Sequence, residues 1–250
     1  STAIYLARGV SLGTSHRVFW LTDSVAPWSL PLEACFHAQS RFFSSVCDAS
    51  DCCGHGIHTL VIDIGAGTTD LCRVYGTIPG PGDQMHTGHA GDFVDNQLIK
   101  EITAKYNGAQ ITKDMARRWK EAYSFVSTAT PDEPVLVDFS IEGKAMTLDI
   151  TDCMQRACES IVDPIVENVK KLIAGSNPEY HDEFRKNMVL AGGGSSIKGL
   201  GALIERRLSD MGDVNVHVVD DPVRLGAMGG LRLAMEIPED MWKNLTLASR

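Results

Sequence analysis

The stretch Asp63-Ile64-Gly65-Ala66-Gly67-Thr68-Thr69-Asp70 decides how the rest of this 250-residue sequence is interpreted. An apolar run, Thr59–Ile64, leads into it and a second run, Asp70–Tyr75, follows, so the pattern predicts a β-hairpin. A glycine-rich tip lets backbone N–H groups converge on an anion. Asp63, at the end of a buried strand, is placed to hold a hydrated Mg²⁺. The residues predicted to bind phosphate are Gly65, Gly67, Thr68 and Thr69. The alternative is an ordinary tight turn.

A second glycine-rich segment, Gly192–Ser195, lies between a predicted strand, Asn187–Ala191, and a predicted helix, Ile197–Met211. Three consecutive glycines would let a flat ligand approach the backbone, and a helix start offers free N–H groups. A dinucleotide-binding loop is the competing interpretation, but its G-x-G-x-x-G spacing after a first strand is not found. We predict that this segment and the hairpin tip face one cleft. Its predicted contacts are Gly192, Gly193, Gly194 and Ser195.

The other predicted elements complete an α/β pattern that opens with a hairpin. We expect one helix capped by Asp92, another capped by Thr112, and a long helix over Thr151–Ala174 with a kink at Pro164. The remaining predicted elements are the strands Val135–Ile141, Ala145–Ile150 and Val214–Val219, and a final helix, Leu225–Met235.

Residues 1–58 differ in composition from the rest of the chain. They contain no lysine, but four of the seven cysteines and four of the eight histidines, and no regular apolar period persists in them. We therefore expect an irregular, poorly packed segment. A zinc site is the alternative, although adjacent cysteines fit the usual ligand spacing poorly. Its candidate ligands are Cys47, Cys52, Cys53, His55 and His58.

Charge and hydropathy exclude several classes of function. The formal net charge is −9, whereas non-specific nucleic-acid binding needs clustered Lys and Arg. No apolar run approaches the roughly 18 residues of a membrane span, and no secretory signal is recognisable. We expect no nucleic-acid partner, no membrane insertion, and a cytoplasmic protein with reduced cysteines.

The order of the motifs resembles that of the actin-like ATPases. After the hairpin come AGDFVD at 90–95, RRWKEAY at 117–123, LAGGGSSIKGL at 190–200 and DPVRLGAMGGLRLA at 221–234. The resemblance covers about residues 57–246 and is strongest to the bacterial members that organise magnetosome chains. It implies an actin-like (ribonuclease H-like) α/β fold, essentially its second half. The implied division is an inner subdomain, 59–109 and 151–246, and an outer subdomain, 110–150.

The same resemblance implies a function. The expected cofactors are ATP and Mg²⁺, with Asp63 near the attacking water and nucleoside contacts from Arg117, Lys120 and Glu121. The expected partners are further copies of the chain, which assemble into filaments, and magnetosome-associated proteins. The expected location is the cytoplasmic cytoskeleton, alongside magnetosome membranes.

Two groups that this family uses for hydrolysis are not recognisable. Ser11 stands where the first phosphate loop of the family has Asp, and residues 44–58 contain no Glu to serve as the catalytic acid. ATP hydrolysis is therefore left open. The alternative is a non-catalytic remnant that acts as a binding module or has no function, and a sugar kinase or chaperone of the same superfamily is more distant.

Overall fold

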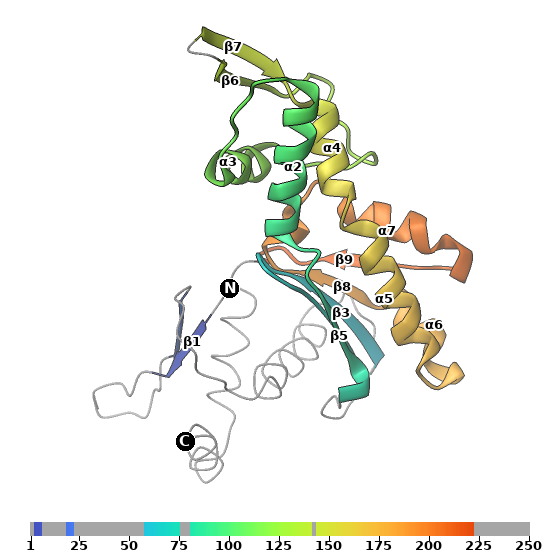
Figure 1. The fold of residues 1–250 in the computed structure, drawn as a ribbon. Coiled ribbons are helices and arrows are strands. Elements are labelled where there is room, and N and C mark those ends of the chain that lie inside the picture. Colours follow the sequence, from blue (N-terminus) through green and yellow to red (C-terminus); the bar gives the residue numbers. More distant parts are fainter. Residues whose placement is uncertain (1–2, 7–18, 23–57, 76–80, 142–143, 223–250) are drawn as a thin grey trace.

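The computed structural model describes residues 3–6, 19–22, 58–75, 81–141 and 144–222 (Figure 1). Two short strands, β1 (Ala3–Leu6) and β2 (Phe19–Thr22), form an antiparallel pair, which the sequence did not predict. The rest of the segment 1–57 and the predicted helix Leu225–Met235 lie outside the described residues. The irregular packing expected of the first segment therefore stays a prediction. The boundaries of the two subdomains also stay predictions.

A five-stranded mixed sheet forms the centre of the described fold, in the order β5-β4-β3-β8-β9. The predicted hairpin is confirmed as β3 (His58–Ile64) and β4 (Thr69–Tyr75), which pair antiparallel. β5 (Gln84–Thr87), which was not predicted, extends it antiparallel beside β4. β8 (Met188–Ala191) and β9 (Val216–Val218) are the predicted strands near the C-terminal end, and β8 runs parallel to β3.

Strand β3 is buried on both faces, as expected for a central strand with a continuous apolar sequence. Leu60, Ile62 and Ile64 belong to the main core on one face of the sheet. Val61 packs on the other face in a smaller cluster. Because Asp63 pairs with Ala191 at the ends of the parallel strands, the chain leaves β3 and β8 at the same edge of the sheet.

The segment between the strands supplies α2 (Gly91–Lys105), α3 (Lys113–Tyr123) and a hairpin of β6 (Leu136–Ile141) and β7 (Lys144–Asp149). The predicted cap by Thr112 is confirmed, because its hydroxyl accepts a hydrogen bond from the backbone of Met115. Figure 1 shows β6 and β7 at the ends of α2 and α4 that lie farther from the sheet.

The predicted cap of α2 by Asp92 is wrong. The helix begins at Gly91 after Ala90, and Ala90 offers no side-chain cap. The first backbone amides donate instead to the hairpin tip: Gly91 to the carbonyl of Gly65 at 3.0 Å and Asp92 to that of Ala66 at 2.7 Å. Carbonyl groups of a distant turn therefore satisfy donors that a capping side chain would otherwise satisfy.

The single long helix predicted over Thr151–Ala174 is two helices, α4 (Thr151–Glu159) and α5 (Val162–Ala174). Pro164 has no N–H to give and its ring clashes with the carbonyl four residues earlier, which is that of Ser160. The interruption consequently falls at Ser160 rather than at the proline. Gly175 follows the end of α5, as predicted.

The last described helices are α6 (His181–Lys186), which was not predicted, and α7 (Leu200–Leu208). The predicted start of α7 at Ile197 is wrong, because Gly199 adopts the left-handed region, with φ of 80°. The 3-10 turns are η1 (Pro81–Asp83), η2 (Pro178–Tyr180), η3 (Gly193–Ser196) and η4 (Ser209–Met211). No helix in the described part of the chain is both long and apolar enough to cross a membrane.

The buried side chain of Arg73 links strand β4 to helix α5 and to the turn η1. Arg73 on β4 donates to the backbone carbonyl of Leu172 at 2.7 Å and to the carboxylate of Asp83 at 2.7 Å. Both members of the ion pair are nearly inaccessible to water. Such a pair is costly to break, because removing one partner leaves a buried charge.

Candidate functional site

The tip of the β3–β4 hairpin presents unused backbone donors. Gly65 donates its amide to the carbonyl of Thr68 at 2.9 Å, which closes the turn. Ala66, Gly67 and Thr68 are exposed. No hydrogen bond between described residues uses the amides of these three residues. Consecutive unpaired N–H groups on an exposed turn form a concavity suited to an anion.

The second glycine-rich segment packs directly against the end of β3. Gly192 has φ of 78°, and a Cβ placed there would lie 2.3 Å from Oδ1 of Asp63 and 2.5 Å from the carbonyl of Ile64. A Cβ on Gly194 would lie 2.2 Å from Cγ2 of Ile64. The second segment thus packs against the strand end that leads into the hairpin tip, beside the half-buried Asp63. The shared cleft stays a prediction.

These contacts change the explanation of the three glycines. Gly192 and Gly194 are required by packing against the protein itself, whereas no atom of the described residues lies within 4 Å of a Cβ built on Gly193. Ser195 is buried, and its hydroxyl and amide both donate to the carbonyl of Gly192, at 2.8 and 3.0 Å. Gly193 is therefore the member of the segment that a ligand can approach most closely.

The two threonines at the tip have different surroundings. The hydroxyl of Thr68 is exposed and donates to Oδ2 of Asp70 at 2.9 Å. Thr69 is fully buried, and its hydroxyl donates to the carbonyl of His89 at 2.8 Å. Thr69 thus joins the start of β4 to the loop before α2, and its hydroxyl proton is already used there.

The predicted nucleoside contacts on α3 also differ from one another. The amino group of Lys120 lies 2.8 Å from the carbonyl of Gly91 and 2.7 Å from Oδ1 of Asp95. The guanidinium of Arg117 lies 3.4 Å from Asp92 and 3.7 Å from Asp95. Glu121 is exposed and has neither a hydrogen bond nor an ion pair among the described residues.

Helix α3 is connected to both glycine-rich segments. Lys120 contacts Gly91, whose amide is bonded to the hairpin tip. Beyond the helix end, Val126 donates to the carbonyl of Lys198 at 3.0 Å, and Lys198 donates to that of Ser124 at 3.2 Å. These bonds tie the end of α3 to the chain that follows Gly192–Ser195.

Asp95 is the residue of this region to which the sequence analysis assigned no role. It is completely buried, on the same face of α2 as Leu98 and Ile102. An acidic residue within the apolar stripe of a helix was the available signal, because buried carboxylates need compensating charge. Nearby Asp92 is more exposed, and the hydrogen bond from Lys113 lowers the pKa of its carboxyl.

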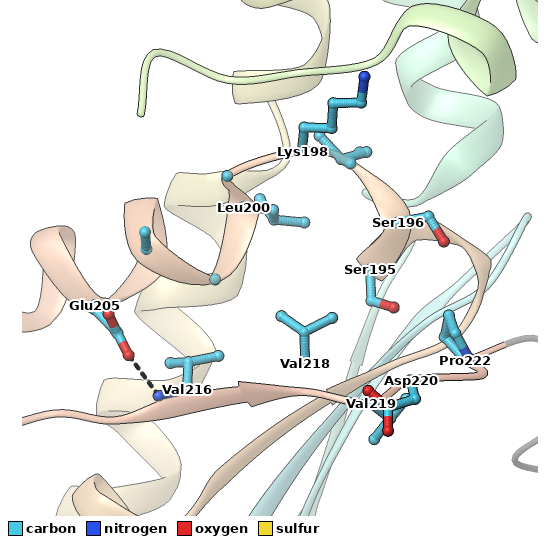
Figure 2. Close-up of a pocket in the computed structure, with 14 residues that line it drawn as sticks. Ser195, Ser196, Lys198, Leu200, Glu205, Val216, Val218, Val219, Asp220 and Pro222 are labelled. Carbon is cyan, nitrogen blue, oxygen red and sulfur yellow. Dashed lines mark hydrogen bonds between the residues drawn. The ribbon is translucent and has the colours of Figure 1, made fainter. Parts of the chain in front are cut away.

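A pocket of about 530 Å³ lies between the start of α7 and strand β9 (Figure 2). Ser195 borders it, and the carboxylate of Glu205 accepts a hydrogen bond from the amide of Val216 at 2.7 Å beside it. Neither Asp63 nor Glu121 lines this pocket. It is therefore distinct from the surface between the two glycine-rich segments.

The zinc alternative finds no support in the described residues. They contain no group of three or more His, Cys, Asp or Glu side chains placed to hold a metal. His58, the one candidate ligand among them, lies 2.5 Å from Oε2 of Glu183 through Nδ1 and stacks on Tyr180. Cys47, Cys52, Cys53 and His55 lie outside the described residues.

Comparison with known proteins identifies the family to which this chain belongs. A family model described as MreB/Mbl protein matches residues 54–241, and the chain therefore belongs to this family of actin-like proteins. It is 41% identical over 189 residues to actin-like protein MamK of Paramagnetospirillum magneticum. It is 37% identical over 196 residues to MamK of Magnetospirillum gryphiswaldense. These alignments cover 76% and 77% of this chain and 54% of each relative.

Solved structures agree with the predicted fold. A MamK double helical filament matches with a TM-score of 0.69 and 41% identity, over 72% of this chain and 55% of the filament chain. A non-polymerising MamK mutant bound to AMPPNP matches with a TM-score of 0.66 and 42% identity, over 71% and 54%. The predicted actin-like fold is thereby confirmed. The chain spans about half the length of the relatives it matches.

Proposed function

We propose that this chain binds an adenine nucleotide with Mg²⁺ between its two glycine-rich segments and assembles into cytoskeletal filaments of the MamK type. The observation that carries the nucleotide part is the row of unused amides at Ala66, Gly67 and Thr68, beside Asp63 and Gly192. Amides on an exposed turn recognise phosphate without needing a cationic side chain. The solved relative that is bound to AMPPNP supports this choice of ligand.

The surroundings of Asp63 fit a hydrated magnesium ion. Mg²⁺ keeps several waters and is usually bound by one or two carboxylates together with phosphate oxygens. Asp63 is half-buried at the end of β3, next to the tip that would hold those oxygens. In this proposal Asp63 orients the waters of the ion, and the ion neutralises phosphate charge.

The nucleoside would extend from Gly193 toward α3. No described residue fills the space beside the backbone of Gly193, and none pairs with the exposed carboxylate of Glu121 on α3. A carboxylate is a suitable acceptor for ribose hydroxyl or adenine amino groups. Lys120 and Arg117 have partners within the protein, so we give Glu121 the direct contact.

The relatives support the proposal on assembly and location. The matched filament structures concern MamK, and the family match over residues 54–241 includes the five-stranded sheet and its helices. We propose that copies of this chain associate into filaments in the cytoplasm, where magnetosome-associated proteins would be their partners. This function is favoured over a remnant without function, since the described glycine-rich segments keep an ordered, mutually packed arrangement.

Hydrolysis is proposed to be slow. Phosphoryl transfer is catalysed mainly by positioning and charge stabilisation. Ser11 replaces the expected aspartate, and residues 44–58 contain no Glu. We therefore expect nucleotide binding and filament assembly to be measurable even though phosphate is released much more slowly than by an intact relative.

The test uses the full 250-residue chain with a fluorescent ATP analogue, with and without Mg²⁺, and sedimentation to detect filaments. We expect saturable binding that Mg²⁺ strengthens, and loss of that strengthening in Asp63→Asn. Asp132→Asn is the matched control, because Asp132 is an exposed acid that belongs to neither segment. Absence of saturable binding, or an equal Mg²⁺ effect in Asp63→Asn, would overturn the nucleotide proposal. Absence of nucleotide-dependent sedimentation would overturn the assembly proposal.

A further inference from the structure

We infer that Asp95 is a positioning residue for the hairpin tip, acting through Lys120 and the backbone of Gly91. The inference rests on the proposed function, because it explains how the amides offered to phosphate are held in place. It also assigns Lys120 a role different from the nucleoside contact that the family resemblance implies.

The first step is electrostatic. Asp95 has no exposed surface, and a buried carboxylate is stable only when it is paired or hydrogen-bonded. Lys120 lies 2.7 Å from Oδ1 and Arg117 lies 3.7 Å from Oδ2. Neither carboxylate oxygen has a well-aligned hydrogen bond, so the two cations supply the compensation. Lys120 is the more enclosed of the two, with 15% of its side chain exposed against 45% for Arg117.

The second step is the contact from Lys120 to the start of α2. While it pairs with Asp95, its amino group also donates to the carbonyl of Gly91 at 2.8 Å. A Cβ on Gly91 would lie 3.3 Å from that nitrogen and 3.2 Å from the carbonyl oxygen of Gly65. The lysine and the hairpin tip therefore hold Gly91 from two sides.

The third step passes from Gly91 to the phosphate donors. The amides of Gly91 and Asp92 bind the carbonyls of Gly65 and Ala66. In a planar trans peptide the carbonyl of one residue and the N–H of the next point in opposite directions. Fixing the carbonyls of Gly65 and Ala66 toward α2 therefore turns the amides of Ala66 and Gly67 away from it, to the exposed side.

This role predicts a separation between phosphate and nucleoside binding. If Lys120 positions the tip, losing its ion pair weakens ligands that carry phosphates and leaves adenosine binding unchanged. If Lys120 instead contacts the ribose, adenosine binding is weakened as well. The two roles can thus be separated by comparing ATP, inorganic tripolyphosphate and adenosine on the same variants.

The experiment measures the affinities of these three ligands, with Mg²⁺, for the full chain and for Asp95→Asn and Lys120→Met. We expect ATP and tripolyphosphate to bind on the order of tenfold more weakly to both variants, with adenosine unchanged. Glu101→Gln is the matched control, since Glu101 is also on α2 and pairs with Arg156 on a neighbouring helix at 2.7 Å. Equal weakening of adenosine and ATP, or no change for ATP, would overturn the inference.

A second measurement needs no nucleotide. Hydrogen exchange at the amides of Gly91 and Asp92 reports whether they remain bonded to the hairpin tip. We expect faster exchange at both amides in Asp95→Asn but not in Glu101→Gln, and unchanged exchange would refute the positioning role even if ATP does not bind. Should Asp95→Asn fail to fold, the double variant Asp95→Asn/Lys120→Met removes both charges and takes its place in both measurements.

Discussion

The two glycine-rich segments look alike in the sequence but use their glycines differently. At the hairpin tip, no described residue lies within 4 Å of a Cβ built on Gly67, and none accepts a hydrogen bond from the neighbouring amides. In the second segment, Gly192 and Gly194 lie where any side chain would collide with Asp63 or Ile64. The first segment therefore has glycine at the surface of the turn, and the second has it where two parts of the backbone meet.

The difference teaches that a glycine cluster does not by itself reveal a ligand site. Glycine serves both for unusual backbone angles and for close approach, either of a ligand or of the protein's own chain. Among the glycines of the second segment, Gly193 alone would place a Cβ away from every described residue. Substitutions at single glycines should separate the two uses.

The largest effect is expected for Gly192→Ala. Alanine at φ of 78° is strained, and its Cβ would be 2.3 Å from Asp63 and 2.5 Å from a backbone oxygen of Ile64. Left-handed strain and overpacking together should lower the free energy of unfolding by about 3 kcal/mol. Urea denaturation followed by circular dichroism measures this. A loss below about 1 kcal/mol would mean that the contact with β3 is looser than described.

Gly194→Ala should destabilise less. Its Cβ would first meet the side chain of Ile64, at 2.2 Å from Cγ2, whereas the nearest backbone atom, the carbonyl oxygen of Ile64, would be 3.2 Å away. Because Ile64 is fully buried and β-branched, it has little freedom to move, and we expect a loss of about 2 kcal/mol. Replacing Ile64 by Ala removes Cγ2 and should reduce the extra cost of the alanine at position 194, as measured by a double-mutant cycle. Strict additivity of the two changes would contradict the proposed collision.

The fold was predictable where local pattern and burial agree. The apolar run before Gly65 and the turn residues identified the hairpin, because a central strand must be apolar on both faces. Strand β5 was missed because Gln84–Thr87 contains one apolar residue and gains its stability from pairing with β4. The break at Ser160 was missed because the apolar stripe continues across it, and the effect of Pro164 falls four residues upstream.

The two glycine-rich segments could be recognised from residue types at 63–70 and 192–195, and the parallel pairing of β3 with β8 brings their strand ends together. The contact between Lys120 and Asp95 joins two different helices, which no local pattern encodes. The buried hydroxyl of Thr69 is a similar case, since its acceptor, the carbonyl of His89, is 20 residues away.

At the hairpin tip, substitutions of the two threonines should also differ in their loss of stability, although both losses should be smaller than those at Gly192 and Gly194. Thr69→Val keeps the shape but removes the hydrogen bond to His89, which should cost about 1 kcal/mol of unfolding free energy. Thr68→Ala removes an exposed hydroxyl and should change stability by less than about 0.5 kcal/mol. Thermal and urea denaturation of the two variants test this. Equal losses would show that burial does not distinguish the two side chains.

The smallest change in stability is expected for Gly193→Ala. This variant is informative because its affinity for Mg-ATP is measured as well. In the part of the chain that the structure describes, no atom lies within 4 Å of the added Cβ, and the backbone of Gly193 is not in the left-handed region. The free energy of unfolding should therefore shift by no more than about 0.5 kcal/mol. The same methyl group would stand in the space through which a nucleotide approaches the backbone. We therefore expect the affinity for Mg-ATP to fall by about tenfold, or 1.4 kcal/mol, while the protein stays as stable as the parent. In Gly194→Ala the pattern should be reversed: the free energy of unfolding should change more than the affinity of the folded protein for Mg-ATP. If Gly193→Ala leaves both stability and affinity unchanged, the open space above Gly193 is not part of the nucleotide site, and the ligand role of the second segment fails.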